Sequence, residues 1–341
     1  MKNLTQPSIS HISIHTIHYK PDNIEFRQVP VTLGDEQENC NLARALLKGF
    51  NRDAVYRFSS GESGEISAFE IFVNEFTGST AEFNDFSAGL AREWMKSDHE
   101  ETKEHELIFC QFRDIQTGTE NGIGYGIFLI NSFEKFVQII RTNHDVSIRL
   151  MEGVNLKKLK YSGLIIPGAD QNRADLYFKD NVYEFKSDVF IHRYLRAKPV
   201  RNNFYNTANH LNILKAYVDH ELQDAEPLEK IEKIARTADY FSSHDHFDQK
   251  EYNSAIFDNP GQREAFDKFR EQYAMDKDIN IVDEFDVSPG AVKKNFSRIR
   301  SVIKLDRNFH VYVHGNRQNI VRGYDPERGK HYYQLFFDEE S

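Results

Sequence analysis

The sequence predicts an α+β protein: an antiparallel or mixed sheet domain, followed by a helical region and a small C-terminal β-hairpin element. Two observations predict this class. Strand-like apolar runs mix with helical patterns over residues 8–150, whereas helical spacing of apolar residues dominates residues 202–275. Because a chain of 341 residues usually forms more than one domain, we expect an N-terminal α+β domain over residues 1–190. A helical region with a basic helix and a terminal β-sheet would occupy residues 191–341.

The composition indicates a folded, acidic protein. Hydrophobic residues make up 39% of the chain, enough for a core, and the formal net charge is -10. This acidity excludes a protein that coats DNA through bulk positive charge, although it allows a local basic site. The two cysteines, Cys40 and Cys110, fit a reducing cytoplasm rather than a disulfide framework. The N-terminus has no apolar signal core, and the longest apolar run is too short for a bilayer, so no membrane partner is expected.

The N-terminal elements follow from the spacing of apolar residues. Ile12 and Ile14 alternate with polar neighbours, as in a β-strand. Apolar residues from Leu42 to Phe50, and from Phe86 to Trp94, recur at helical spacing. Further strand-like runs cover residues 54–58, 106–112 and 123–130. This order predicts an α+β domain with an antiparallel sheet.

A β-hairpin is predicted over residues 172–190, because the Asp-Asn pair at 180–181 tolerates the left-handed backbone of a two-residue turn. That turn would place Asp175 opposite Lys186 and put Glu184 on the same face. Restriction-type nucleases place an Asp on one strand and Glu-x-Lys on its partner, so that the carboxylates bind Mg²⁺ and the lysine helps to activate water. A metal-dependent nuclease is therefore one alternative function. The plainer interpretation is a cross-strand ion pair between Asp175 and Lys186, with Glu184 in solvent.

Three amphipathic helices are predicted in the middle of the chain. Their apolar stripes run from Phe204 to Leu222, from Leu228 to Ala238 and from Phe266 to Tyr273. Pro227 suits the first turn of the second helix. The many acidic residues of this region are interpreted as a solvated face.

A basic helix is predicted from its N-cap, Ser288, through Lys304, with Pro289 at the first helical position. A strand over residues 309–313 and a hairpin around residues 325–330 would follow. Cationic side chains kept together on an acidic chain are typical of a protein with a polyanionic partner.

The order of three segments carries a resemblance. They are the strand at residues 9–15 with its histidines, the Ala174-Asp175-Leu176 segment followed by the helix at 202–222, and the closing residues 303–326. Together they resemble the bacterial nucleoid-associated protein family over nearly the whole chain. The resemblance implies a cytoplasmic, nucleoid-localised protein that binds DNA or nucleoid components and has no established enzyme chemistry. It implies no catalytic or base-reading residues.

Two basic clusters contain the candidate DNA contacts. The predicted basic helix carries Lys293, Lys294, Arg298, Arg300 and Lys304. The second cluster comprises Arg193, Arg196, Lys198 and Arg201, near Tyr194, Phe204 and Tyr205. Lysine and arginine would contact phosphates, and arginine with tyrosine can also stack on bases. The alternative is that both clusters are simply solvated.

A helix-turn-helix is a second hypothesis for the basic helix. Residues 279–285 would form a short first helix, and the basic helix would dock on DNA. No cofactor is expected. Two sets of histidines are interpreted as ordinary polar positions rather than metal sites: His244 and His246 with Asp245 and Asp248, and His11, His15 and His18.

The sequence therefore predicts non-enzymatic binding to DNA in the bacterial nucleoid, mainly through phosphates. Two alternatives stay open: the metal-dependent nuclease, and a protein-interaction module that is recruited to the nucleoid through its acidic helices and does not touch DNA. A homodimer is possible, because a single basic patch gives weak binding.

Overall fold

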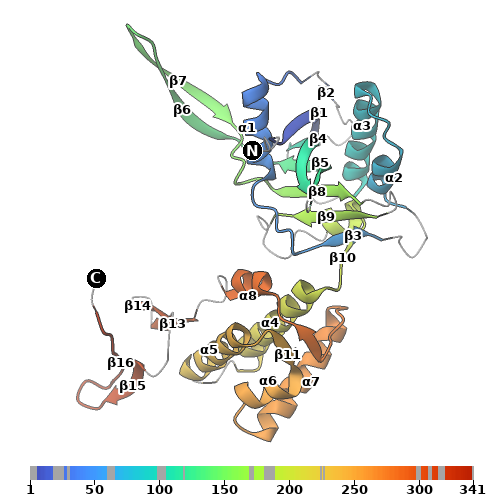
Figure 1. The fold of residues 1–341 in the computed structure, drawn as a ribbon. Coiled ribbons are helices and arrows are strands. Elements are labelled where there is room, and N and C mark those ends of the chain that lie inside the picture. Colours follow the sequence, from blue (N-terminus) through green and yellow to red (C-terminus); the bar gives the residue numbers. More distant parts are fainter. Residues whose placement is uncertain are drawn as a thin grey trace. The chain divides into compact units, whose positions relative to one another are not determined.

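A computed structural model describes most of the chain (Figure 1). It describes residues 6–17, 27–28, 31–59, 66–97, 105–117, 120–168, 173–179, 189–222, 225, 227–296, 301–305, 309–313 and 319–339. The chain forms two compact units, Met1–Val200 and Arg201–Ser341. Within the described ranges, no helix combines the length and the apolar character of a membrane span.

The first unit is built on an eight-stranded sheet in which all neighbouring strands are antiparallel. The strands lie in the order β10-β3-β9-β8-β5-β4-β1-β2. They are β1 (Ser8–Ile17), β2 (Arg27–Gln28), β3 (Tyr56–Phe58), β4 (His105–Thr117), β5 (Glu120–Ile130), β8 (Tyr161–Pro167), β9 (Ala174–Phe178) and β10 (Ala197–Pro199). Because β10 pairs with β3, residues 197–199 at the end of the unit lie beside residues 56–58.

Helices cover both faces of this sheet. Helix α1 (Glu36–Leu47) packs on one face, and its first turn is closed by a capping box between Asp35 and Glu38. The other face is covered by α2 (Ala68–Glu75), α3 (Thr80–Ser97) and the π-helix η1 (Val189–Tyr194). The side chains of β5 alternate between the two cores, with Ile127 in one and Phe128 in the other. The sheet is therefore the middle layer of the unit.

A two-stranded ribbon leaves this unit between β5 and β8 (Figure 1). It is formed by β6 (Glu134–Arg141) and β7 (Val146–Gly153), which pair antiparallel along their whole length. In the described part of the chain, no third strand joins them. The ribbon was not predicted from the sequence.

The second unit is mainly helical. Its helices are α4 (Asn203–His220), α5 (Pro227–Ser243), α6 (Gln249–Ile256), α7 (Pro260–Asp276) and α8 (Pro289–Phe296). They surround an aromatic core in which the buried His210 ring lies 4.3 Å from that of Phe247, centroid to centroid. Burial lowers the pKa of His210 well below its ordinary value, and Arg270 adds to this effect.

Short antiparallel strand pairs complete the second unit. The first pairs β11 (His246–Asp248) with β12 (Glu284–Asp286), and the second pairs β13 (Ser301–Leu305) with β14 (Phe309–Val313). The last pairs β15 (Ile320–Asp325) with β16 (Lys330–Leu335), around the predicted turn.

Many predicted elements are confirmed. The fold class is α+β, the strand-like runs form β1, β3, β4, β5 and β14, and the predicted helices are α1, α3, α4, α5 and α7. Helix α5 begins at Pro227, as predicted. The N-cap of α8 is also confirmed, because the Ser288 hydroxyl accepts a hydrogen bond from the Ala291 amide at 3.4 Å.

The predicted length of the basic helix is wrong. Helix α8 ends at Phe296, and Lys304 lies in strand β13, where it pairs with His310. Residues 301–305 are rich in β-branched side chains, which favour a strand when a partner such as β14 is available.

The helix-turn-helix prediction is also wrong. Its proposed first helix contains β12, which pairs with β11 instead. The Phe285 ring stacks on Phe247 at 4.5 Å between centroids. This aromatic contact holds β12 against β11, and residues 279–283, which carry the β-branched side chains, form no helix.

Candidate nucleic-acid interface

One edge of the first unit's sheet gathers cationic side chains. Lys198 of β10 is directly opposite Arg57 of β3 in the strand register. Across the next pair of strands, Arg57 Nε donates to Asp175 Oδ1 at 2.9 Å. Facing residues in paired strands share a face, so these side chains form a row across three strands. Lys198 is exposed, and the described part of the chain gives it no carboxylate partner.

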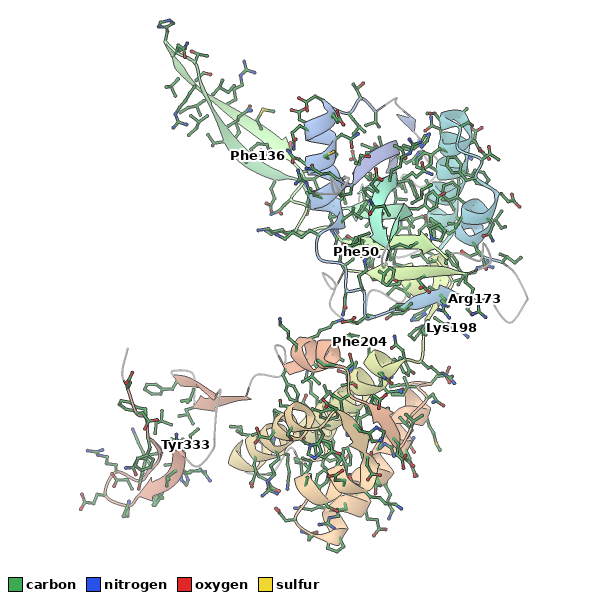
Figure 2. The ribbon with its side chains drawn as sticks, in the orientation of Figure 1. Phe50, Phe136, Arg173, Lys198, Phe204 and Tyr333 are labelled. Carbon is green, nitrogen blue, oxygen red and sulfur yellow. The ribbon has the colours of Figure 1, made fainter. Side chains whose placement is uncertain are left out.

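Two further arginines lie on this edge. The Arg52 guanidinium carbon is 4.9 Å from the centroid of the Tyr177 ring, and Tyr177 shares a face of β9 with Asp175. Arg173 is exposed directly before β9, and Figure 2 shows it at the same edge as Lys198. We call Arg52, Arg57, Arg173 and Lys198 the sheet-edge cations.

Sequence reasoning identified only Lys198 of the sheet-edge cations. Arg57 and Asp175 are 118 residues apart, and strand order alone brings their segments together. A lysine beside a proline on an edge strand also prevents unwanted strand pairing, which is a purely structural role for Lys198 and Pro199. That role does not explain Arg57 on the neighbouring strand, nor Arg52 and Arg173, which lie just outside the strands.

Arg193 and Arg196 lie at a different place from Lys198. Both line a hollow of about 420 Å³ together with Phe69 and Glu93. Arg193 belongs to the π-helix η1, and Arg196 has a φ of 51°, which is unusual for a residue other than glycine. The strained backbone is held in place by the Arg196 carbonyl, which accepts from the Ser59 amide at 2.8 Å.

Two of the three predicted aromatic neighbours cannot stack on bases. Tyr194 is only 5% exposed, and its hydroxyl donates to the Leu90 carbonyl at 3.0 Å. Phe204 is buried as well. These two rings serve the cores, whereas Tyr205 is half-buried and its hydroxyl accepts from the Asn280 amide at 3.3 Å.

In the second unit, α8 brings the two predicted clusters partly together. Lys294 Nζ lies 5.4 Å from the centroid of the Phe204 ring, in the first turn of α4. Arg201 is exposed two residues before that helix. Lys293 is exposed on α8, and the described residues include no carboxylate paired with it. Since a helix N-terminus also favours anions, this end of α4 suits a phosphate.

The other predicted contacts cannot be placed. Arg298 and Arg300 lie outside the described residues, and only the backbone of Lys304 is described.

The strand pairing on which the nuclease hypothesis depended is wrong. Both edges of β9 are occupied, because Asp175 is opposite Arg57 on one side and Ile166 on the other. No edge is left to pair Asp175 with Lys186, and Asp175 is instead ion-paired with Arg57. Glu184 and Lys186 lie outside the described residues. Among the residues that are described, no group of three or more His, Cys, Asp or Glu could hold a metal ion.

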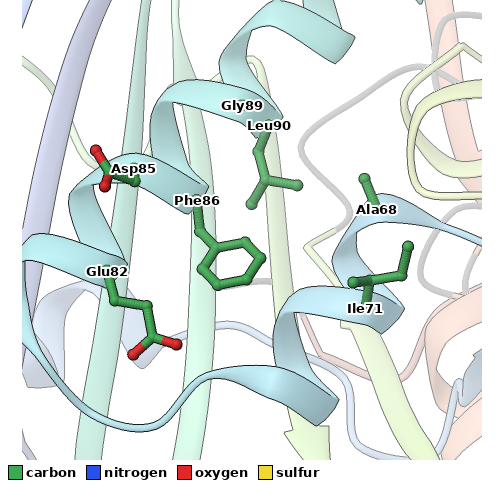
Figure 3. A pocket seen from close by; sticks show the side chains of 7 residues that line it. All are labelled: Ala68, Ile71, Glu82, Asp85, Phe86, Gly89 and Leu90. Atoms are coloured by element: carbon green, nitrogen blue, oxygen red, sulfur yellow. The ribbon is translucent and has the colours of Figure 1, made fainter.

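A cavity of about 600 Å³ lies between α2 and α3 (Figure 3). Its walls are mostly apolar, with Ile71, Phe86 and Leu90 pointing into it, and its polar groups are the carboxylates of Glu82 and Asp85. The Thr77 hydroxyl donates to Glu82 at 2.6 Å, and this hydrogen bond lowers the pKa of that carboxyl. Negative charge at the rim makes this cavity unsuitable for a phosphate.

Comparison with known proteins gives the family. The model of a family described as nucleoid-associated protein YejK (NA37) matches residues 13–330. The chain belongs to this family. Membership implies association with DNA and a location at the nucleoid. No curated protein matches the chain.

Proposed function

We propose that the protein binds DNA within the bacterial nucleoid through contacts to phosphates, with little sequence readout and without catalysis. Family membership supports association with the nucleoid. The observation that supports direct contact with DNA is that the sheet-edge cations lie together on a chain of net charge -10. On such a chain, cations from separate strands at one edge form a local site for a polyanion.

The proposed contacts fall in both units. In the first they are the sheet-edge cations with Arg193 and Arg196, and in the second they are Arg201, Lys293 and Lys294. Arg298, Arg300 and Lys304 belong to the same proposal through the sequence alone. The proposal also assigns the protein to the cytoplasm, where the nucleoid lies.

A salt titration of DNA affinity tests this proposal. Each phosphate contact releases counterions, so Lys198→Glu is expected to weaken binding and to lower the slope of log K against log salt by about 1. Lys293→Glu tests the second unit in the same way. The matched control is Lys157→Glu, which changes net charge equally at another exposed lysine of the first unit.

Two results would contradict the proposal. If Lys198→Glu and Lys293→Glu bind DNA as the Lys157→Glu control does, these lysines do not contact phosphates. If the unchanged protein never shifts DNA at low salt, a protein partner recruits it to the nucleoid.

A further inference from the structure

One face of the β6–β7 ribbon is apolar and exposed. The strand register sets Val137 opposite Leu150 and Ile139 opposite Ile148, so these four side chains share a face. Their exposed fractions are 58%, 69%, 49% and 71% respectively. We call them the apolar quartet. In a soluble monomer, a contiguous apolar patch of this kind marks an interaction site.

The opposite face of the ribbon is less suited to an apolar contact. It carries Gln138 and Arg149 as a facing pair. Its apolar pair, Phe136 and Met151, is 50% and 40% exposed, less than most of the apolar quartet, and Phe136 lies over Gly153, where a Cβ atom would be 3.0 Å from the ring edge (Figure 2 labels Phe136). The apolar quartet is therefore the more open face.

The ribbon is held at both ends. At its base, Glu134 accepts from Lys158 Nζ at 2.6 Å and from Asn155 Nδ2 at 3.0 Å, and these contacts lower the pKa of its carboxyl. At its tip, the Thr142 amide donates to the Asp145 carbonyl at 2.9 Å. The Asp145 amide donates in return to the Thr142 hydroxyl at 3.1 Å. These hydrogen bonds define the direction of the ribbon and its turn.

A ribbon of this kind needs a cover. Two strands alone are marginal in water, and they become stable when another layer packs on their apolar face. Eight residues per strand, at about 3.4 Å each, give a face roughly 27 Å long. Within the described chain, no third strand pairs with the ribbon. No core cluster of the described residues includes the apolar quartet.

We propose that the apolar quartet is a dimer interface, on which the ribbon of a second copy of this chain packs face to face. A two-fold contact places the same patch on both copies, and an apolar patch is complementary to itself. The result would be a small sandwich of two ribbons about 10 Å apart.

The charges around the apolar quartet favour a second copy. Glu152 borders the face at its base, opposite Lys135, and Arg141 borders it at the tip. If the ribbons run in the same direction, Glu152 of one copy lies over Lys135 of the other. If they run in opposite directions, it lies beside Arg141, but Lys135 then lies over Arg141 of the other copy, so the charges favour the same direction. Either two-fold arrangement gives this carboxylate a cationic partner.

The overall charge of the ribbon disfavours DNA as its occupant. The cations Lys135, Arg141 and Arg149 are balanced by Glu134, Asp145 and Glu152. A balanced surface does not attract a polyanion, and it lets two copies of an acidic chain approach without repulsion.

Molar mass in solution, measured without DNA over a wide range of protein concentration, tests the interface. The unchanged chain is expected to form dimers. Ile148→Glu is expected to raise the dimer dissociation constant roughly a hundredfold or more, because it buries an unpaired carboxylate in an apolar contact. The matched control is Ser147→Glu, which adds the same charge at the adjacent position on the opposite face and should still dimerise.

Fluorescence of the only tryptophan, Trp94, shows whether each variant is folded. A wild-type chain that stays monomeric, or an Ile148→Glu variant that dimerises normally, would overturn the proposal. A folded Ser147→Glu control that dissociates as much as Ile148→Glu would also overturn it. Loss of DNA affinity in Ile148→Glu with unchanged mass would assign the ribbon to DNA instead. Because molar mass is measured without DNA, the test of dimerisation is independent of the proposed DNA binding.

Discussion

Strand β5 and the β6–β7 ribbon follow one another in the chain, and both are regular antiparallel strands with apolar side chains. Ile127 of β5 is 1% exposed, whereas Ile148 of β7 is 71% exposed. The difference comes from the layers that cover β5 on both faces and are absent around the described ribbon. Strand pairing alone therefore does not determine burial, and an identical residue has a different role in each place.

The largest expected effect is on the covered sheet. Ile127→Ala should lower the free energy of unfolding of the first unit by about 2–5 kcal/mol, because it leaves a cavity among tightly packed side chains. Chemical denaturation followed by Trp94 fluorescence measures this, since Trp94 is fully buried in the same core. A loss no larger than that of an exposed residue would mean that the sheet is not packed as described.

The second effect, of intermediate size, is a pH dependence of the free energy of unfolding that comes from a buried histidine of the covered sheet. His15 of β1 is buried, with Nε2 2.9 Å from Ser87 Oγ, and burial lowers its pKa from 6.5 to about 4. As pH falls from 6.5 to 4, the unfolded chain binds a proton that the folded chain does not. Stability should therefore fall in this window, by at most about 1.4 kcal/mol per pH unit for one proton.

Urea denaturation at several pH values measures this dependence. His15→Gln should reduce the slope of stability against pH between 6.5 and 4. Above pH 7 the wild-type histidine is neutral in both states, so that range serves as the internal control. An equal slope in wild type and variant would assign the acid sensitivity to other groups.

The smallest effect is expected on the ribbon. Ile148→Ala should change the stability of the first unit by no more than about 0.5 kcal/mol, because its side chain is mostly in solvent. The measurement is the denaturation used for Ile127→Ala, at a concentration low enough to keep the chain monomeric. A loss as large as that of Ile127→Ala would show that a layer of the same chain covers the ribbon.

Local features of the sequence predicted much of the fold. Alternation and helical spacing identified β1, β4, β5, α1, α3 and α4, and side-chain capping placed the start of α8. Prediction failed where a distant partner decided the structure. The segments 284–286 and 301–305 are strands because β11 and β14 lie beside them. The prediction of a hairpin after Asp175 was wrong because β3 and β8 already pair with the two edges of β9.

The candidate site divides in the same way. The basic residues themselves could be read from the sequence, since charge is a property of each residue. Their grouping could not, because only the order of strands in the sheet puts Arg52, Arg57 and Arg173 at the same edge as Lys198. Arg193 and Arg196 were predicted with Lys198, yet both line a separate hollow, Arg193 from the π-helix and Arg196 from the residues after it.

By itself, the sequence determined the acidic balance of the protein, its α+β class and the resemblance that the family model confirmed. These depend on composition, on local periodicity and on the order of segments along the chain. Tertiary structure alone decided which strands are covered, which cations share an edge and which apolar residues remain in solvent. Those properties come from contacts between residues far apart in the chain, and no local pattern records them.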